Sequence, residues 1–144
     1  MPEKTIQVLL VEDDEVDAEE MLRFFDKLGI SNPITGVPDG YAALSVLRGE
    51  EGYERLPRPY IILLDLNMPR MNGLEFLQAI RSDDELRQSV VFVLTTSDDE
   101  ADMEAAYASN VAGYFLKART GEEFLDLPKM MTNYWRLVEF PTPK

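Results

Sequence analysis

Residues 60–69 read YIILLDLNMP, and their pattern is the clearest indication of the fold. Its first five residues are all aliphatic or aromatic, and a run without polar alternation is typical of a strand covered on both faces of a sheet. We therefore predict a buried strand at Tyr60–Leu66. Four further short apolar runs predict strands at Thr5–Val11, Pro33–Val37, Val90–Thr95 and Gly113–Lys117.

Amphipathic stretches follow these runs, and each of them predicts a helix. The first helix is expected at Glu15–Leu28, the second after Asp39 as its N-cap, and the third at about 73–81. The residues expected to face the core repeat at helical spacing: Leu22, Phe25 and Leu28; Tyr41, Leu44 and Leu47; Leu74, Leu77 and Ile80; Phe124, Leu127, Met131, Trp135 and Val138.

Two sequence patterns predict where the last two helices begin. Residues 97–100 (SDDE) and 120–123 (TGEE) match the capping box, in which a Ser or Thr side chain and a Glu three residues later bond each other's backbone N–H groups. Pro128 falls inside the last predicted helix, where it would remove a hydrogen bond and clash with the preceding turn. We therefore predict a kink or a restart of this helix near 126–128.

The alternation of strands and helices determines the predicted architecture. Parallel strands need long crossovers, and apolar strands need cover on both faces. We therefore predict an α/β fold of the flavodoxin-like, doubly wound type: a five-stranded parallel sheet in the order 2-1-3-4-5 with five helices around it. The polar segment Gly49–Pro59 is interpreted as a loop insertion within this fold.

Composition excludes several kinds of chemistry. The 144 residues include 14 basic and 27 acidic side chains, for a formal net charge of −13, and neither Cys nor His occurs. Disulfides, thiolate nucleophiles, Ser-His nucleophiles and imidazole metal ligands are therefore excluded. The acidic charge disfavours nucleic acid and anionic membranes as partners, and no apolar run approaches the ~20 residues of a membrane span. We expect one cytoplasmic domain, residues 1–144.

Polar residues lie where four of the predicted strands end. Glu12 and Asp13 follow the first strand, Asp65 lies at the end of the third, and Thr95 and Lys117 end the fourth and fifth. In a doubly wound sheet these ends meet at the crevice where ligands bind. Carboxylates without His or Cys suit Mg²⁺, and a hydroxyl with a lysine can hold a phosphoryl group.

These residues belong to segments that resemble the response-regulator receiver domain of two-component signalling. The matching segments are VLLVEDD at 8–14, ILLDLNMP at 62–69 with NG at 72–73, VLTTS at 93–97, and GYFLK at 113–117. Four motifs occur in the right order at the right strand ends, and the resemblance extends over essentially the whole chain. It implies that the protein accepts a phosphoryl group and changes a surface in response.

The resemblance also implies a role for each residue at the predicted site. Asp65 would be the phosphate acceptor and would ligate Mg²⁺ together with Asp13, with Glu12 through a water molecule, and with the backbone carbonyl of Asn67. Thr95 and Lys117 would contact the phosphoryl oxygens.

Three further residues are implied to act on the phosphorylated state. Tyr114 would be an aromatic switch that turns inward when Thr95 moves toward the phosphate. Asn67 and Ser97 would flank the phosphate and tune the rate of its slow self-catalysed hydrolysis.

The partners are implied less directly. The chain has no His, so the phosphohistidine donor must lie on another protein, a sensor histidine kinase. The loop at 48–59 and the ending NYW at 133–135 resemble stand-alone receivers that serve bacterial phytochromes, which have no output domain and pass the signal to a downstream phosphotransfer or target protein. An apolar set at the end of the chain suggests a homodimer contact: Met131, Tyr134, Trp135, Val138 and Phe140.

One departure from the family pattern and two rival functions also follow from the sequence. Receivers usually have Pro after the lysine, often in a cis peptide, whereas Ala118 stands here and a cis bond before it would cost about 2.5–4 kcal/mol. Phosphatases of the haloacid dehalogenase type are one rival, but they place an acid two residues after the nucleophile, where this chain has Asn67. The other rival is a binding module that is no longer phosphorylated.

Overall fold

The sheet has the predicted topology. A computed structural model describes residues 5–68, 70–117, 126–137 and 139–140. Five parallel strands lie in the order β2-β1-β3-β4-β5. Their bounds are β1 (Gln7–Val11), β2 (Ile34–Val37), β3 (Tyr60–Leu64), β4 (Val90–Thr95) and β5 (Gly113–Leu116). This confirms the flavodoxin-like α/β fold, and each predicted strand is present with its ends shifted by no more than two residues.

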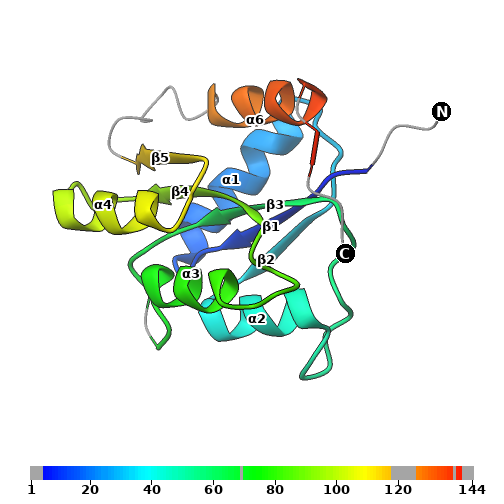
Figure 1. Cartoon of the computed structure of the whole chain (residues 1–144). Coiled ribbons are helices and arrows are strands. Elements are labelled where there is room, and N and C mark those ends of the chain that lie inside the picture. The colour runs from blue at the N-terminus through cyan, green and yellow to red at the C-terminus, as the bar shows by residue number, and fades with distance from the viewer. Residues whose placement is uncertain (1–4, 69, 118–125, 138, 141–144) are drawn as a thin grey trace.

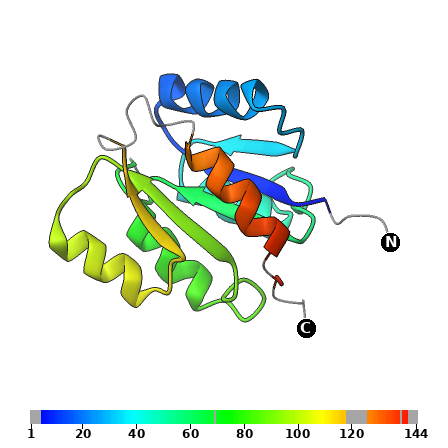
Figure 2. The ribbon, with the colours of Figure 1, turned by 90° about the horizontal axis from the view of Figure 1, so that it is seen from above.

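Helices cover both faces of this sheet. They are α1 (Glu15–Lys27), α2 (Gly40–Arg48), α3 (Gly73–Arg81), α4 (Glu100–Ala108) and α6 (Asp126–Leu137). Figures 1 and 2 show α1 and α6 on one face, with α2 and α3 on the other. One core cluster joins the sheet to α2, α3 and α4, and a second joins it to α1 and α6. The sheet is therefore the middle of three layers.

Alternate strand residues supply the two cores. In β3, Ile62 and Leu64 belong to one cluster while Ile61 and Leu63 belong to the other, and all four are completely buried. Each apolar side chain buried in this way stabilises the fold by roughly 1.5–3 kcal/mol. The continuous apolar run of the sequence is thus explained by burial on both faces.

One residue in each of two predicted helix faces is exposed, although Phe25, Leu44 and Leu47 are buried as predicted. Leu22 and Tyr41 were expected to be buried, yet they are 44% and 51% exposed. In α1 the buried residues are Met21 and Phe25, one turn apart, so Leu22 lies 100° around the helix from Met21 and faces solvent. The Arg70 guanidinium instead lies over the Tyr41 ring in a cation–π contact, with its Cζ atom 5.1 Å from the centre of that ring.

The helix N-termini are capped by Asp and Asn side chains. Asp14 and Asp39 accept N–H bonds in α1 and α2, and Asn72 forms a complete capping box with Glu75 in α3. The helix predicted to begin at 97–100 does begin there, with Glu100 as its first residue, but the capping box is wrong. Asp99 is the N-cap of α4 and accepts the Ala101 N–H, whereas the Ser97 hydroxyl donates to the Asp102 carboxylate at 2.6 Å. The box predicted at 120–123 lies outside the described residues.

The last helix packs into the core, and the Trp135 side chain, which belongs to the suggested dimer contact, lies outside the described residues. Met131 is completely buried, and the Tyr134 ring meets Phe92 edge-to-face at 5.1 Å. Phe140 packs in turn against Tyr134. Met131 therefore cannot form the suggested dimer contact, and the Val138 part of that suggestion lies outside the described residues.

Pro128 lies in α6, two residues after the first described residue of this helix. The predicted kink or restart depends also on residues 118–125, which lie outside the described residues, as does the Lys117-Ala118 peptide.

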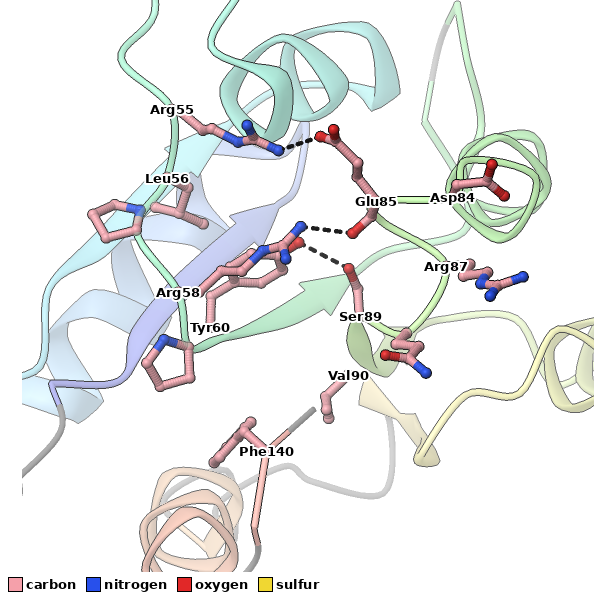
Figure 3. A pocket seen from close by; sticks show the side chains of 13 residues that line it. Arg55, Leu56, Arg58, Tyr60, Asp84, Glu85, Arg87, Ser89, Val90 and Phe140 are labelled. Carbon is pink, nitrogen blue, oxygen red and sulfur yellow. Dashed lines mark hydrogen bonds and ion pairs between the residues drawn. The ribbon is translucent and has the colours of Figure 1, made fainter. Parts of the chain in front are cut away.

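The inserted loop lines one side of an open pocket of about 550 Å³ at the amino end of the sheet, shown in Figure 3. Arg55 pairs with the Glu85 carboxylate, Arg58 donates to the Glu85 carbonyl oxygen, and the hydroxyls of Tyr60 and Ser89 lie 2.9 Å apart. These contacts attach the insertion to the loop between α3 and β4.

Among the described helices, none has the length and apolar content needed to cross a bilayer.

Candidate functional site

Three carboxylates gather at the carboxyl end of the sheet. The β1 and β3 strands are neighbours, with Val11 opposite Leu64, so the residues that follow them emerge side by side. Backbone bonds hold both exits, because Asp65 N–H donates to Val11 O and Glu12 N–H donates to Val37 O, each at 3.0 Å. Carboxylate oxygens of Glu12, Asp13 and Asp65 all lie within 4.8 Å of one another.

The environments of these three acids differ. Glu12 and Asp65 are buried, whereas Asp13 is exposed. Burial raises the pKa of Glu12 to about 7; the Lys117 hydrogen bond opposes this shift and the neighbouring Asp65 adds to it. The raised pKa means that a third negative charge beside Asp13 and Asp65 is unfavourable in this pocket. A bound positive charge would relieve that repulsion.

Lys117 supplies one such charge, and it is shared. Its Nζ atom lies 2.5 Å from Glu12 Oε1, 2.7 Å from Asp17 Oδ2 and 3.4 Å from Asp65 Oδ2. Burial lowers the pKa of Lys117, but the carboxylates of Asp17 and Glu12 outweigh this and raise it above the ordinary value. The ammonium therefore stays charged and links β5 to the acids that follow β1 and β3.

Sequence reasoning missed Asp17. It lies in the first turn of α1, where acidic residues are common for helix-dipole reasons alone. A signal was present, since Asp13 and Asp17 are four residues apart. That spacing alone could not show that a lysine a hundred residues away reaches this turn.

The loop after Asp65 is shaped by a glycine. A Cβ atom on Gly73 would lie 2.6 Å from Leu66 Cα and 2.7 Å from Asp65 O, so only glycine fits at the start of α3. Gly73 N–H donates to Leu66 O at 3.0 Å, and Asn67 N–H donates to Asp65 Oδ1 at 3.1 Å. The backbone thus holds one Asp65 oxygen while the other faces Lys117.

A chain of polar contacts joins Asp65 to Tyr114. The Asn67 side-chain amide lies 3.4 Å from the Thr95 hydroxyl, and Thr95 also accepts the Ser97 N–H. The Ser97 carbonyl in turn accepts the Tyr114 hydroxyl at 2.9 Å. Burial raises the pKa of Tyr114, which keeps this hydroxyl a donor. Thr95 and Tyr114 are therefore coupled through the backbone of one residue.

The structure brings together every residue that the sequence predicted for the site. Six of them meet directly or through one hydrogen bond: Glu12, Asp13, Asp65, Asn67, Thr95 and Lys117. Ser97 and Tyr114 lie at the rim, connected through the loop after β4.

This chain belongs to the response regulator receiver domain family, whose model matches residues 8–127. The same family accounts for the sheet order and for acids at the ends of β1 and β3.

Individual relatives are similar over most of their length. The probable methanogenesis regulatory protein FilR2 of Methanothrix harundinacea is 39% identical, with 89% of this chain and 82% of the relative aligned. The response regulator Rcp1 of Synechocystis is 34% identical, covering 89% and 87% of the two chains. A crystal structure of the Mn²⁺-bound form of Rcp1 superposes with a TM-score of 0.82, covering 94% of this chain and 99% of that one. The crystal structure of the phosphorylated cyanobacterial phytochrome response regulator RcpA, which is 31% identical, superposes with a TM-score of 0.84, covering 94% of this chain and 98% of that one.

The acidic cluster fits a divalent metal ion. Its donors are carboxylate oxygens within 4.8 Å of one another, which is the hard-oxygen donor set that Mg²⁺ and Mn²⁺ take. The exposed Asp13 leaves one side of the cluster open to water, and Mg²⁺ usually retains water ligands.

Proposed function

We propose that this protein is a response regulator whose Asp65 accepts a phosphoryl group from the phosphohistidine of a sensor kinase. One observation carries the proposal: the buried Asp65 carboxylate lies beside both an acidic cluster and the Lys117 ammonium. One oxygen of Asp65 attacks phosphorus, the P–N bond breaks, an acyl phosphate forms, and the imidazole leaves and takes a proton from solvent.

The roles of the surrounding residues follow from where charge develops. Glu12, Asp13, Asp65 and the Asn67 carbonyl would hold Mg²⁺, which neutralises charge on the transferring group when it is bound. Lys117 and Thr95 would each contact a phosphoryl oxygen. Their positions are supported by the 3.4 Å approach of Lys117 to Asp65 and by the Asn67 bridge to Thr95.

The change of surface would run from Thr95 to Tyr114. If Thr95 moves toward the phosphate, the Ser97 N–H loses its acceptor and the Ser97 carbonyl that holds Tyr114 shifts. Asn67 and Ser97 stand where water would approach the acyl phosphate and would tune its hydrolysis rate. Tyr107, whose ring lies 6.4 Å from that of Tyr114, extends this path to an exposed side chain.

The partner that supplies the phosphoryl group is a histidine kinase, and two of the relatives indicate different stimuli. RcpA is a phytochrome response regulator, whereas FilR2 is a probable methanogenesis regulator. A phytochrome-type kinase is the proposed partner, since the similar solved structure of RcpA is that of a phytochrome response regulator. Action in the cytoplasm completes the proposal.

The test is intact mass spectrometry after incubation with acetyl phosphate. Wild type with Mg²⁺ should gain one phosphoryl group, whereas omission of Mg²⁺ or the Asp65→Asn substitution should abolish the adduct. Asp98→Asn, a change at an exposed acid near the site, is the matched control and should be phosphorylated normally.

Failure of the wild type with acetyl phosphate and with a panel of purified histidine kinases would contradict the proposal and favour the silent binding module. Steady turnover of phosphomonoesters would favour the phosphatase rival.

A further inference from the structure

Asp17 makes a close contact that the proposed reaction does not use. Its carboxylate lies 2.7 Å from Lys117 Nζ, and its own backbone N–H is fixed by the Asp14 cap at 3.1 Å. The side chain is about one-third exposed, while Lys117 is 12% exposed. Asp17 is therefore a fixed carboxylate at the rim that reaches in to a buried ammonium.

The same ammonium contacts two of the predicted metal ligands. Lys117 lies 2.5 Å from Glu12 and 3.4 Å from Asp65, and both acids belong to the cluster that fits a divalent ion. A cation bound there and the lysine would compete for the same oxygens. The contact with Asp17 is shorter than that with Asp65, so Asp17 draws the ammonium toward α1 and away from the acceptor.

We infer that Asp17 is a positioning residue that takes up part of the Lys117 ammonium and keeps it back from Asp65, so that a divalent cation can bind the acidic cluster. The ammonium keeps its contact with Glu12. The inference rests on the proposed function for the identity of the metal site. Asp17 itself is not among the clustered acids whose oxygens lie close enough to share an ion. It acts on the metal through the lysine and through its charge.

Removal of the Asp17 charge has two consequences of the same sign. The site loses one negative charge, which weakens its attraction for a cation. In addition, Lys117 loses one anionic partner and moves more fully onto Glu12 and Asp65, which competes with the metal. Both effects lower the affinity for Mg²⁺, so the direction of the result is unambiguous.

The experiment is a calorimetric titration of the full chain with Mg²⁺ alone, without any phosphoryl donor. Asp17→Asn should weaken Mg²⁺ binding by about fivefold, the size expected for one nearby, partly screened charge. Asp17→Glu should recover most of the affinity. Glu15→Gln is the matched control, because Glu15 lies in the same first turn and has no ion pair within the described residues. It should change the affinity by less than twofold.

A double-mutant cycle separates positioning from a merely structural role. In a Lys117→Met background, Asp17→Asn should have a smaller effect, limited to the loss of its own charge, because the competing ammonium is gone. An equal effect in both backgrounds, or no effect in the wild-type background, would overturn the inference. If the wild type itself bound no Mg²⁺, the proposed metal site would fail instead, so the two failures are distinguishable.

Discussion

The two ends of the sheet use charge in opposite ways. At the carboxyl end, Glu12, Asp13 and Asp65 crowd together around one shared ammonium, and the pKa of Glu12 rises to about 7. At the amino end, within the described part of the chain, Arg81 donates to backbone carbonyls, and Arg55 and Arg58 are engaged by Glu85. The carboxyl end keeps unbalanced charge that a ligand can relieve, whereas the amino end uses charge to close loops.

In this receiver, the residues that stabilise the fold and the residues of the candidate site lie at opposite ends of the sheet. Arg81 is the clearest stabilising residue, because its guanidinium bonds the carbonyls of Arg87, Ser89, Ser109 and Asn110 at 2.7–3.1 Å. Burial lowers the pKa of Arg81, and every donor direction described points to a carbonyl of a connecting loop. Changes here should destabilise the protein without altering its chemistry.

The largest effect is expected at Arg81. Arg81→Met leaves four carbonyls without this donor, so unfolding in urea should show a loss of about 3 kcal/mol. The rate of phosphorylation by acetyl phosphate, measured well below the midpoint of unfolding, should remain that of the wild type. Arg55→Ala is the control, because both members of its ion pair are more than half exposed, and it should cost less than about 0.5 kcal/mol. A loss below 1 kcal/mol for Arg81→Met would contradict the contrast.

Gly73 tests whether stability and function meet at the carboxyl end. Gly73→Ala places a methyl group 2.6 Å from Leu66 Cα and 2.7 Å from Asp65 O, so the acceptor loop must shift. We expect a loss of about 2 kcal/mol in urea unfolding together with slower phosphorylation. Gly36→Ala meets no atom within 4 Å and should change neither quantity measurably. Normal phosphorylation of a destabilised Gly73→Ala would show that loop geometry matters less than the structure indicates.

At Glu12 we expect a smaller effect on the free energy of unfolding, which depends on pH and is seen in the metal-free protein. Its pKa is raised from 4.5 to about 7 in the folded state, so its stabilising contribution is complete below pH 4.5 and is lost as pH rises through 7. In EDTA, wild-type stability should therefore fall between pH 5 and pH 8 by about 1–2 kcal/mol more than that of Glu12→Gln. Urea unfolding at four pH values measures this. Parallel profiles for the two proteins would contradict the origin given for the shift.

The sequence was sufficient for the architecture and for most of the site. Five apolar runs predicted the strands. The polar residues at the carboxyl ends of four of them predicted the candidate site, because parallel strands bring these ends to one edge. These residues are Glu12, Asp13, Asp65, Thr95 and Lys117. Helix faces were less well predicted. Leu22 and Met21 are adjacent apolar residues, and only packing against the sheet selects which of them is buried.

Local sequence by itself thus determined which residues form strands, where those strands end, and which polar side chains follow them, since these depend on short-range pattern. Tertiary structure alone decided which charges meet. Asp17 reaches Lys117 across 100 positions of sequence, and Arg81 reaches Ser109 across 28. Such contacts depend on how α1, α3 and the loops pack against the sheet. A local sequence pattern does not specify which residues far apart in the chain will meet.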